Sequence, residues 1–149
     1  MNITVSCGNI FDSKMQTLTI PVNTVCVMGK GLALELKRNY YDAFVAYSNM
    51  CADGVLKIGK PCVYRRTQLP WFLMFPTKDD WRNPSKLEYI ELGMRWLHEN
   101  YKREGIRSIA IPALGCGLGG LNWEDVGAII VAYASKMDIP VEIYIPTHR

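Results

Sequence analysis

The sequence predicts an α/β fold, in which helices cover both faces of a partly parallel sheet. Short apolar runs bounded by glycine or proline, the pattern of buried strands, alternate with longer segments whose apolar residues recur at helical spacing. The runs 71–75 and 106–111 are rich in large apolar residues, which is typical of strands covered on both faces. Two glycine-containing loops each connect a predicted strand to a predicted helix, as in βα units.

The expected strands are short. Their ranges are 2–7, 18–22, 62–66, 71–75, 106–111 and 141–146. A short connection containing Gln68 and Pro70 joins the third and fourth strands, which predicts a hairpin. Pro21 lies inside the second strand and has no amide proton for the ladder, so it predicts either an edge position or a bulge there.

The expected helices cover 32–40, 41–52, the stretch between Ser85 and Gly105, and 123–136. The third is marked by an apolar stripe at three- and four-residue steps, formed by Leu87, Ile90, Met94, Leu97 and Tyr101. Ser85 and Glu88 match a capping box at its start. His98 lies off the stripe, so we interpret it as a surface residue without a catalytic role. Asn122 is suited to cap the fourth helix.

Length and composition limit the classes of protein. A chain of 149 residues with 49% hydrophobic residues is expected to form one domain over residues 1–149. Its apolar runs are too short to span a membrane and its start does not resemble a signal peptide, so a cytoplasmic protein is expected. The five cysteines show neither Cys-x-x-Cys spacing nor a nearby histidine, which predicts free thiols and no metal site. A net charge of +3 is compatible with nucleic acid or a phosphorylated ligand and does not distinguish them.

The most informative segment follows the strand 106–111. Glycines occupy positions 115, 117, 119 and 120, just before the helix that Asn122 caps. A loop so poor in side chains lets backbone amides approach an anion together, next to a helix N-terminus. The alternative is that these glycines only form a tight turn. Four glycines in six residues exceed what a turn requires, which favours phosphate or pyrophosphate binding.

A second glycine-containing loop covers residues 23–31. Gly29 and Gly31 flank Lys30, and a helix is expected directly afterwards, so this loop could hold the same ligand from the other side. The pattern is neither a Walker loop nor the Gly-x-Gly-x-x-Gly dinucleotide motif. Lys30 is interpreted as a solvated lysine near a helix start.

In four segments the chain resembles a macro domain, most closely the branch of DarG-like DNA ADP-ribosyl glycohydrolases, which is related to terminal ADP-ribose protein glycohydrolase. The segments are 8–10, 22–31, 75–88 and 111–123, and they follow the order of the family. The resemblance implies a three-layer α/β/α fold with a mixed, mostly parallel central sheet. It also implies that the ligand is ADP-ribose and that no cofactor is needed.

Individual ligand contacts also come from this resemblance. Asn9 and Ile10 would lie at the adenine, where many macro domains carry an aspartate instead of Asn9. The distal ribose would contact Asn23, Thr24, Met28, Gly29, Lys30 and Gly31. The diphosphate would be wrapped by Gly115, Cys116, Gly117, Leu118 and Gly119, and Thr77 would be a further ligand contact.

Lys78 is the candidate catalytic residue. It follows the predicted strand 71–75 at the carboxyl end, where ligand crevices of α/β sheets open. By resemblance it corresponds to the lysine that hydrolysis requires in the DarG-like and terminal ADP-ribose protein glycohydrolase branches. A lysine amine can attack the anomeric carbon of ribose, or it can stabilise charge and move a proton as the glycosidic bond breaks. These two roles stay open.

The resemblance implies an enzyme that removes ADP-ribose from thymidine bases in DNA, as the antitoxin of a toxin–antitoxin pair does. Gly119 stands where the protein glycohydrolase carries an aspartate, which favours ADP-ribosylated single-stranded DNA over an ester-linked protein. The alternatives are a module that only binds ADP-ribose and a hydrolase of protein-linked ADP-ribose or of ADP-ribose 1''-phosphate. A DarT-like toxin is the implied partner, and the chain is expected to act as a monomer without contacting a membrane.

Basic residues close in sequence to the site could form a rim for a DNA backbone, or they could be ordinary solubilising charges. They are Lys57, Lys60, Arg65, Arg66, Arg82 and Lys86.

Overall fold

The structure is a computed structural model that describes residues 2–146 of the chain. Its strands are β1 (Ile3–Ser6), β2 (Thr17–Asn23), β3 (Cys62–Tyr64), β4 (Trp71–Lys78), β5 (Ile109–Ile111) and β6 (Val141–Tyr144). Its helices are η1 (Ile10–Asp12, a 3-10 helix), α1 (Gly31–Asn39), α2 (Tyr41–Ala52), α3 (Leu87–Glu104) and α4 (Trp123–Ala134). All six predicted strands and four predicted α-helices are therefore confirmed, with shifted ends.

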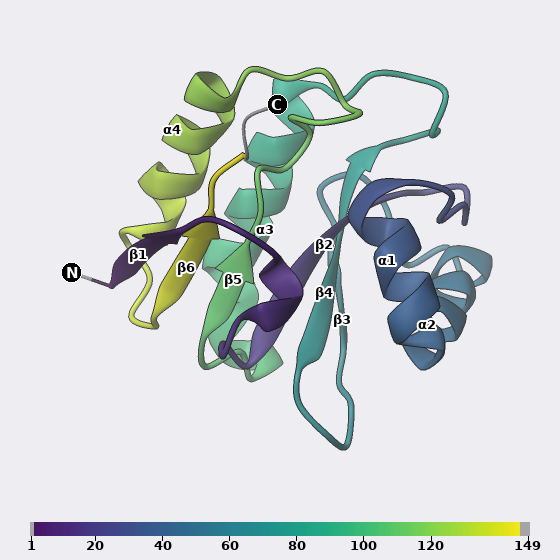
Figure 1. The fold of residues 1–149 in the computed structure, drawn as a ribbon, viewed down its shortest axis with the longest axis horizontal. Coiled ribbons are helices and arrows are strands. Elements are labelled where there is room, and N and C mark those ends of the chain that lie inside the picture. The colour runs from purple at the N-terminus through teal and green to yellow at the C-terminus, as the bar shows by residue number, and fades with distance from the viewer. Residues whose placement is uncertain (1, 147–149) are drawn as a thin grey trace.

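The strands form one mixed sheet in the order β1-β6-β5-β2-β4-β3. All neighbouring pairs are parallel except β3 and β4, which form the expected antiparallel hairpin. Because all strands except β3 run in the same direction, their carboxyl ends meet at one edge of the sheet. The segments that follow β2, β4 and β5 lie along this edge, which is uppermost in Figure 1.

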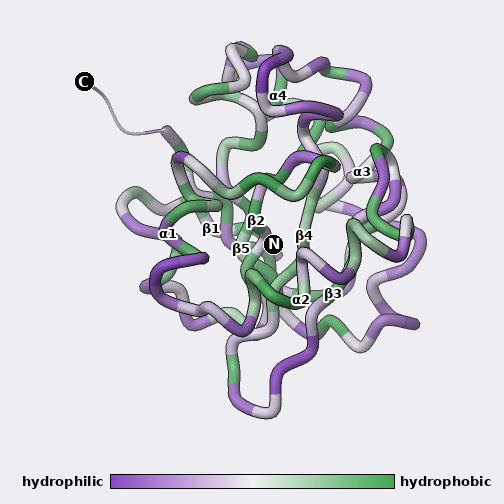
Figure 2. Tube along the Cα trace, turned by 90° about the vertical axis from the view of Figure 1, so that its right-hand side faces the viewer, coloured by the Kyte–Doolittle hydropathy of each residue, from purple (hydrophilic) through white to green (hydrophobic). Residues whose placement is uncertain are grey.

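Helices cover both faces of the sheet, which confirms the three-layer arrangement (Figure 1). On one face α3 and α4 pack with β4, β5 and β6 in an apolar cluster that includes Phe75, Met94 and Ile130. On the other face α1 and α2 pack with β2 around Ile20, Leu36 and other buried residues. Figure 2 shows hydrophobic segments running through the centre of the molecule and most hydrophilic segments at its periphery.

The expectation for Pro21 was partly wrong. β2 is an internal strand between β5 and β4, so the edge position is excluded. The proline is tolerated because β5 pairs with β2 only at Thr17 and Leu18, and the ladder on that side has ended before Pro21. On the β4 side the register shifts between Val22 and Asn23, so an irregularity lies one residue beyond the position that the proline suggested.

The prediction that Ser85 and Glu88 form a capping box was also wrong. The N-cap of α3 is Lys86, and no side chain caps this helix. Ser85 is instead buried, and its amide donates to the carbonyl oxygen of Gly119 at 3.1 Å. The sequence pattern was present, but packing against the loop 115–121 turns Ser85 away from the helix that follows it.

Gly93 lets α3 pack closely on the sheet. A Cβ atom at this position would lie 2.2 Å from Cζ of Phe75. We expect Gly93→Ala to destabilise the fold by about 1–3 kcal/mol through overpacking. This cost outweighs the gain of about 1 kcal/mol in helix propensity.

Urea unfolding measures this change. The matched control is the same substitution in a Phe75→Leu background, where the smaller side chain should relieve most of the added cost. A Gly93→Ala protein as stable as the parent would contradict the close packing of α3 on β4.

No helix among residues 2–146 is long and apolar enough to cross a membrane.

Candidate active site

A cleft of about 1340 Å³ opens at the carboxyl ends of the parallel strands. Its walls come from segments distant in sequence: the end of β1, the loop 23–31 after β2, the end of β4, the loop 112–121 after β5, and the end of β6. This is where a parallel sheet leaves backbone groups and loops free to hold a ligand. The two glycine-containing loops thus lie in one cleft, as their sequences suggested.

Asn23 shapes the first glycine loop from within. Its side chain is nearly buried, and its amide nitrogen donates to the carbonyl of Val27 at 2.7 Å. Its amide oxygen accepts from the backbone amides of Val25 and Val27, and from the hydroxyl of Tyr47 on α2. These bonds occupy the amide oxygen and one of the two N–H groups of the side chain. Asn23 borders the cleft, and its amide oxygen and one amide N–H hold the loop, which leaves one N–H for another acceptor.

The N-terminus of α1 faces the cleft with amides that have no acceptor among residues 2–146. Lys30 is the N-cap residue and makes no side-chain cap bond. The first amides of a helix have no partner within it, so those of Gly31, Leu32 and Ala33 need acceptors from elsewhere. All three residues line the cleft. The helix N-terminus therefore presents unpaired amides and a partial positive charge to a ligand there.

The second glycine loop presents a row of amides. The amides of Gly117, Leu118 and Gly119 have no acceptor among the residues that the structure describes, and all three residues line the cleft. By contrast, Asn122 caps α4 as expected, because its side chain accepts from the amide of Glu124 at 2.7 Å. An anion held at this loop would therefore contact the loop amides rather than the helix end.

Close packing explains the glycine at position 119. A Cβ atom there would lie 2.4 Å from the carbonyl oxygen of Gly115 and 2.4 Å from Oγ of Ser85. Gly115 itself has φ +74°, which L side chains rarely adopt, and Leu121 donates its amide to the carbonyl of Gly115 at 2.9 Å. The loop is thus compact, and any side chain at position 119 would force it open.

Lys78 is the last residue of β4, which runs three residues further than predicted. Its ammonium group donates to the carbonyl of Trp81 at 3.3 Å and to the carbonyl of Leu118 at 3.2 Å. The amine therefore links the segment after β4 to the second glycine loop at the edge of the cleft. A lysine ammonium has three donors, so one direction is left for a ligand.

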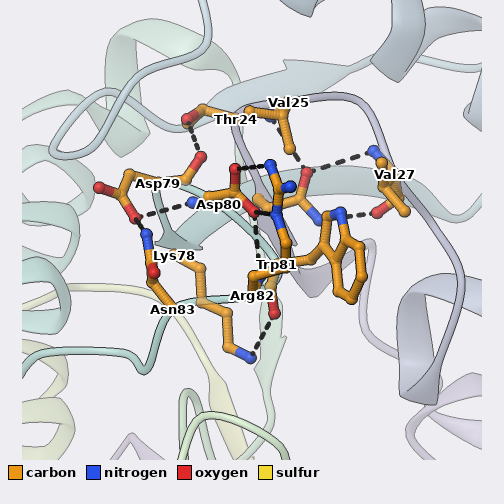
Figure 3. A network of polar contacts seen from close by, with 10 residues as sticks. Thr24, Val25, Val27, Lys78, Asp79, Asp80, Trp81, Arg82 and Asn83 are labelled. Carbon is orange, nitrogen blue, oxygen red and sulfur yellow. Dashed lines mark hydrogen bonds and ion pairs between the residues drawn. The ribbon is translucent and has the colours of Figure 1, made fainter.

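Figure 3 shows the segment 78–83, in which the Lys78 ammonium points away from the acidic side chains. Arg82 forms an ion pair with Asp80, with its Nη2 atom 2.7 Å from Oδ2. The hydrogen bonds from Arg82 lower the pKa of the Asp80 carboxyl to about 2. Thr24 joins this segment to the first glycine loop by donating its hydroxyl to the carbonyl of Asp79 at 2.7 Å.

Cys116 lines the cleft but is an unsuitable nucleophile. Burial raises the pKa of its thiol to about 11, so the thiol is protonated at neutral pH. Among residues 2–146 no group of three or more histidine, cysteine, aspartate or glutamate side chains could hold a metal ion. Lys78 is therefore the group at the cleft whose position best suits it for chemistry.

The cleft brings together most of the predicted site residues. Those that line it are Asn9, Ile10, Asn23, Gly29, Lys30, Gly31, Thr77, Lys78, Gly115, Cys116, Gly117, Leu118 and Gly119. Two do not line it. Met28 is buried in the core cluster beneath α1 and α2, and Thr24 is turned toward Asp79. Asn9 lines the cleft, but its amide group is engaged with Glu35 and the amide of Phe11.

Several lining residues were missed. Glu35 belongs to no motif, and Tyr144 lies in a strand that the sequence marked only as apolar. Trp81 lies in segment 75–88, which resembles the family, but no role was assigned to it.

The predicted basic rim is mostly not at the cleft. Arg65 and Arg66 follow β3, at the opposite end of the hairpin from Lys78, and are paired with Glu104 and Asp42. Of the six basic residues only Arg82 lines the cleft, and Asp80 balances its charge.

Comparison with known proteins places this geometry in a family. A family model described as "Macro domain" matches residues 20–130. The chain belongs to the macro domain family. One curated relative is a DNA ADP-ribosyl transferase–DNA ADP-ribosyl glycohydrolase fusion protein from Thermosipho africanus. The two sequences are 45% identical over an alignment of 166 residues, which covers 99% of this chain and 43% of that protein.

Solved structures agree with this assignment. The structure of Thermosipho africanus DarTG in complex with ADP-ribose has a TM-score of 0.96 and 47% identity, and the match covers 99% of this chain and 42% of that one. The macrodomain of Mycobacterium tuberculosis DarG has a TM-score of 0.93 and 41% identity, covering 97% of this chain and 98% of that one. The resemblance to the DarG-like branch is thus confirmed. The chain spans less than half the length of the first curated relatives it matches.

Proposed function

We propose that the chain is a DNA ADP-ribosyl glycohydrolase, which binds ADP-ribose in the cleft and removes it from thymidine bases in single-stranded DNA. The observation that carries this proposal is the position of Lys78. Its amine contacts both the segment after β4 and the second glycine loop, which line the cleft. Relatives more than 40% identical over nearly the whole chain carry the words DNA ADP-ribosyl glycohydrolase in their names.

The cleft suits a dinucleotide-sized, doubly charged ligand. Its volume of about 1340 Å³ exceeds what a single phosphate needs. The unpaired amides at the start of α1 and those of Gly117, Leu118 and Gly119 face the same space and can share the charges of a diphosphate. In this arrangement, Ile10 lies at the adenine end and Lys78 at the distal ribose end.

The reaction adds water across a glycosidic bond. The anomeric carbon of the ribose gains a hydroxyl, the bond to the base nitrogen breaks, and that nitrogen receives a proton. Lys78 has one donor direction free, toward the cleft, and its amine can assist this step in either of the two ways open to lysine.

The second glycine loop bears on the substrate class. A carboxylate that could assist cleavage of an ester-linked protein cannot be placed at position 119, because a Cβ atom there would meet Ser85 and the backbone of Gly115. This supports DNA-linked ADP-ribose over protein-linked ADP-ribose. A DNA ADP-ribosyl transferase, the activity joined to this one in the Thermosipho africanus fusion protein, would supply the substrate.

The competing proposal is a module that only binds ADP-ribose. Both proposals require binding, so titration calorimetry with ADP-ribose is the first experiment. We expect one ADP-ribose per chain, with weaker binding of AMP because AMP cannot occupy the diphosphate loops fully. If no heat of binding appears at millimolar ADP-ribose, both proposals are wrong.

A further inference from the structure

We propose that Trp81 is a stacking platform for the thymine from which ADP-ribose is removed. The proposal rests on the proposed function and names the part of the cleft that recognises the leaving base. It is drawn from the contacts of the Lys78 amine with Trp81 and Leu118, together with the exposure of these two side chains.

The two residues that fix the Lys78 amine both expose large apolar side chains. The amine donates to the backbone carbonyls of Trp81 and Leu118. The indole is 50% exposed and the leucine side chain 64% exposed, and both residues line the cleft. Any base attached to a ribose beside this amine must therefore lie close to these surfaces. Neither side chain contributes to the two apolar core clusters of the described chain.

Leu118 covers the diphosphate region, which leaves Trp81 for the base. The Cδ1 atom of Leu118 lies 3.7 Å from the place that a Cβ atom of Gly31 would occupy. The leucine thus reaches from the second glycine loop to the first, across the amides that face a diphosphate. Trp81 lies in the segment after β4, and its carbonyl is the other acceptor of the Lys78 amine (Figure 3). An aromatic face there can stack with a base, because every nucleobase presents a flat π surface.

The indole is held in place before any ligand arrives. The guanidinium of Arg82 lies over the Trp81 ring, 5.5 Å from its centre. Asp80 fixes that guanidinium with contacts of 2.9 Å and 2.7 Å to its Nε and Nη2 atoms. A ring positioned in this way loses less conformational freedom when a base stacks on it.

The charges around Trp81 favour an uncharged partner. Asp80 balances the charge of Arg82, and the exposed carboxylate of Asp79 offsets the ammonium of Lys78, so segment 78–82 has no net charge. A phosphate would gain no net attraction here, whereas the face of a base needs none. We therefore expect contacts at this rim to depend weakly on salt, unlike phosphate contacts, which weaken steeply as salt rises.

The test compares Trp81→Ala and Trp81→Phe with the parent on two substrates, thymidine ADP-ribosylated on its base and a single-stranded oligonucleotide carrying the same nucleoside. Stacking is worth about 1–3 kcal/mol, so Trp81→Ala should lower kcat/KM roughly tenfold or more on both substrates. Trp81→Phe, which keeps an aromatic face, should recover most of this loss. The Kd for free ADP-ribose, measured by calorimetry, should not change. Tyr41→Ala, which removes another exposed aromatic ring far from the cleft, is the matched control.

Three results would overturn the proposal. One is an unchanged kcat/KM for Trp81→Ala. Another is a loss confined to the oligonucleotide, which would assign Trp81 to a neighbouring base. The third is an equal loss of affinity for free ADP-ribose, which would place Trp81 in the ADP-ribose site. If the parent cleaves neither substrate, the proposed function fails instead, and stacking is then judged from the affinity of the modified thymidine for parent and Trp81→Ala proteins.

Discussion

Lys78→Ala is expected to abolish release of ADP-ribose from thymidine-modified DNA while leaving ADP-ribose binding largely intact. The amine is at the edge of the cleft, whereas the amides that can hold the diphosphate belong to α1 and the second glycine loop. Loss of a group that acts in the transition state lowers turnover without a matching loss of affinity. The fall in rate should be at least about a hundredfold.

The assay measures ADP-ribose released from a modified oligonucleotide, with calorimetry on both proteins. Lys86→Ala is the matched control, because Lys86 does not line the cleft and its ammonium lies over the ring of Tyr89, 5.7 Å from the centre. Lys78→Arg separates the two possible roles: it keeps a charged donor, so it should retain substantial activity only if Lys78 acts through charge. An alanine variant that cleaves as fast as the parent would show that Lys78 is not catalytic.

Gly119→Ala is expected to cause the largest loss of ADP-ribose affinity among single methyl additions in the cleft. The new methyl group would lie 2.4 Å from both the Gly115 carbonyl oxygen and Ser85 Oγ, and at least the first of these is backbone that cannot move aside easily. Overpacking of this kind costs about 1–3 kcal/mol. If the loop opens to relieve it, Kd should rise roughly ten- to hundredfold.

Gly117→Ala is the matched control, because it is the same change two residues away. A Cβ atom at Gly117 meets nothing within 4 Å, and its backbone conformation is open to other residues. Its Kd for ADP-ribose should rise less than that of Gly119→Ala, because the new methyl group can hinder only the approach of the ligand and does not strain the loop. Equal effects of the two substitutions would mean that the compactness of the loop around Ser85 does not matter for binding.

Much of this fold could be predicted because helix ends, apolar stripes and buried strands depend on residues that are close together in the sequence. The stripe on α3 buries Ile90, Met94 and Leu97, and Gly105 ends that helix with φ +83°. Strands β4 and β5 were recognisable because their residues are buried on both faces. The shared edge of the parallel strands then brought the two glycine loops together, so the location of the cleft could be predicted as well.

Other features depend on contacts between distant segments. β4 continues through Thr77 to Lys78 because Lys78 pairs with Asn23 of β2, which no local pattern shows. Ser85 matched a capping box but is buried against Gly119. Asn23 looked like a ligand contact, and its bonds to Val25, Val27 and Tyr47 became visible only in the folded chain.

Trp81 was missed for a different reason. A single aromatic residue in a polar loop has no periodicity, and only the bond from Lys78 to its carbonyl places it beside the candidate catalytic amine.

The proposed activity of this cleft is cleavage of the bond between ADP-ribose and a thymidine base. The most direct measurement is mass spectrometry of a single-stranded oligonucleotide with one ADP-ribosylated thymidine, incubated with the parent protein. We expect the mass to return to that of the unmodified oligonucleotide, with one free ADP-ribose released for each strand. An unchanged oligonucleotide mass, under conditions in which calorimetry shows the protein saturated by ADP-ribose, would contradict the enzyme and leave a binding module.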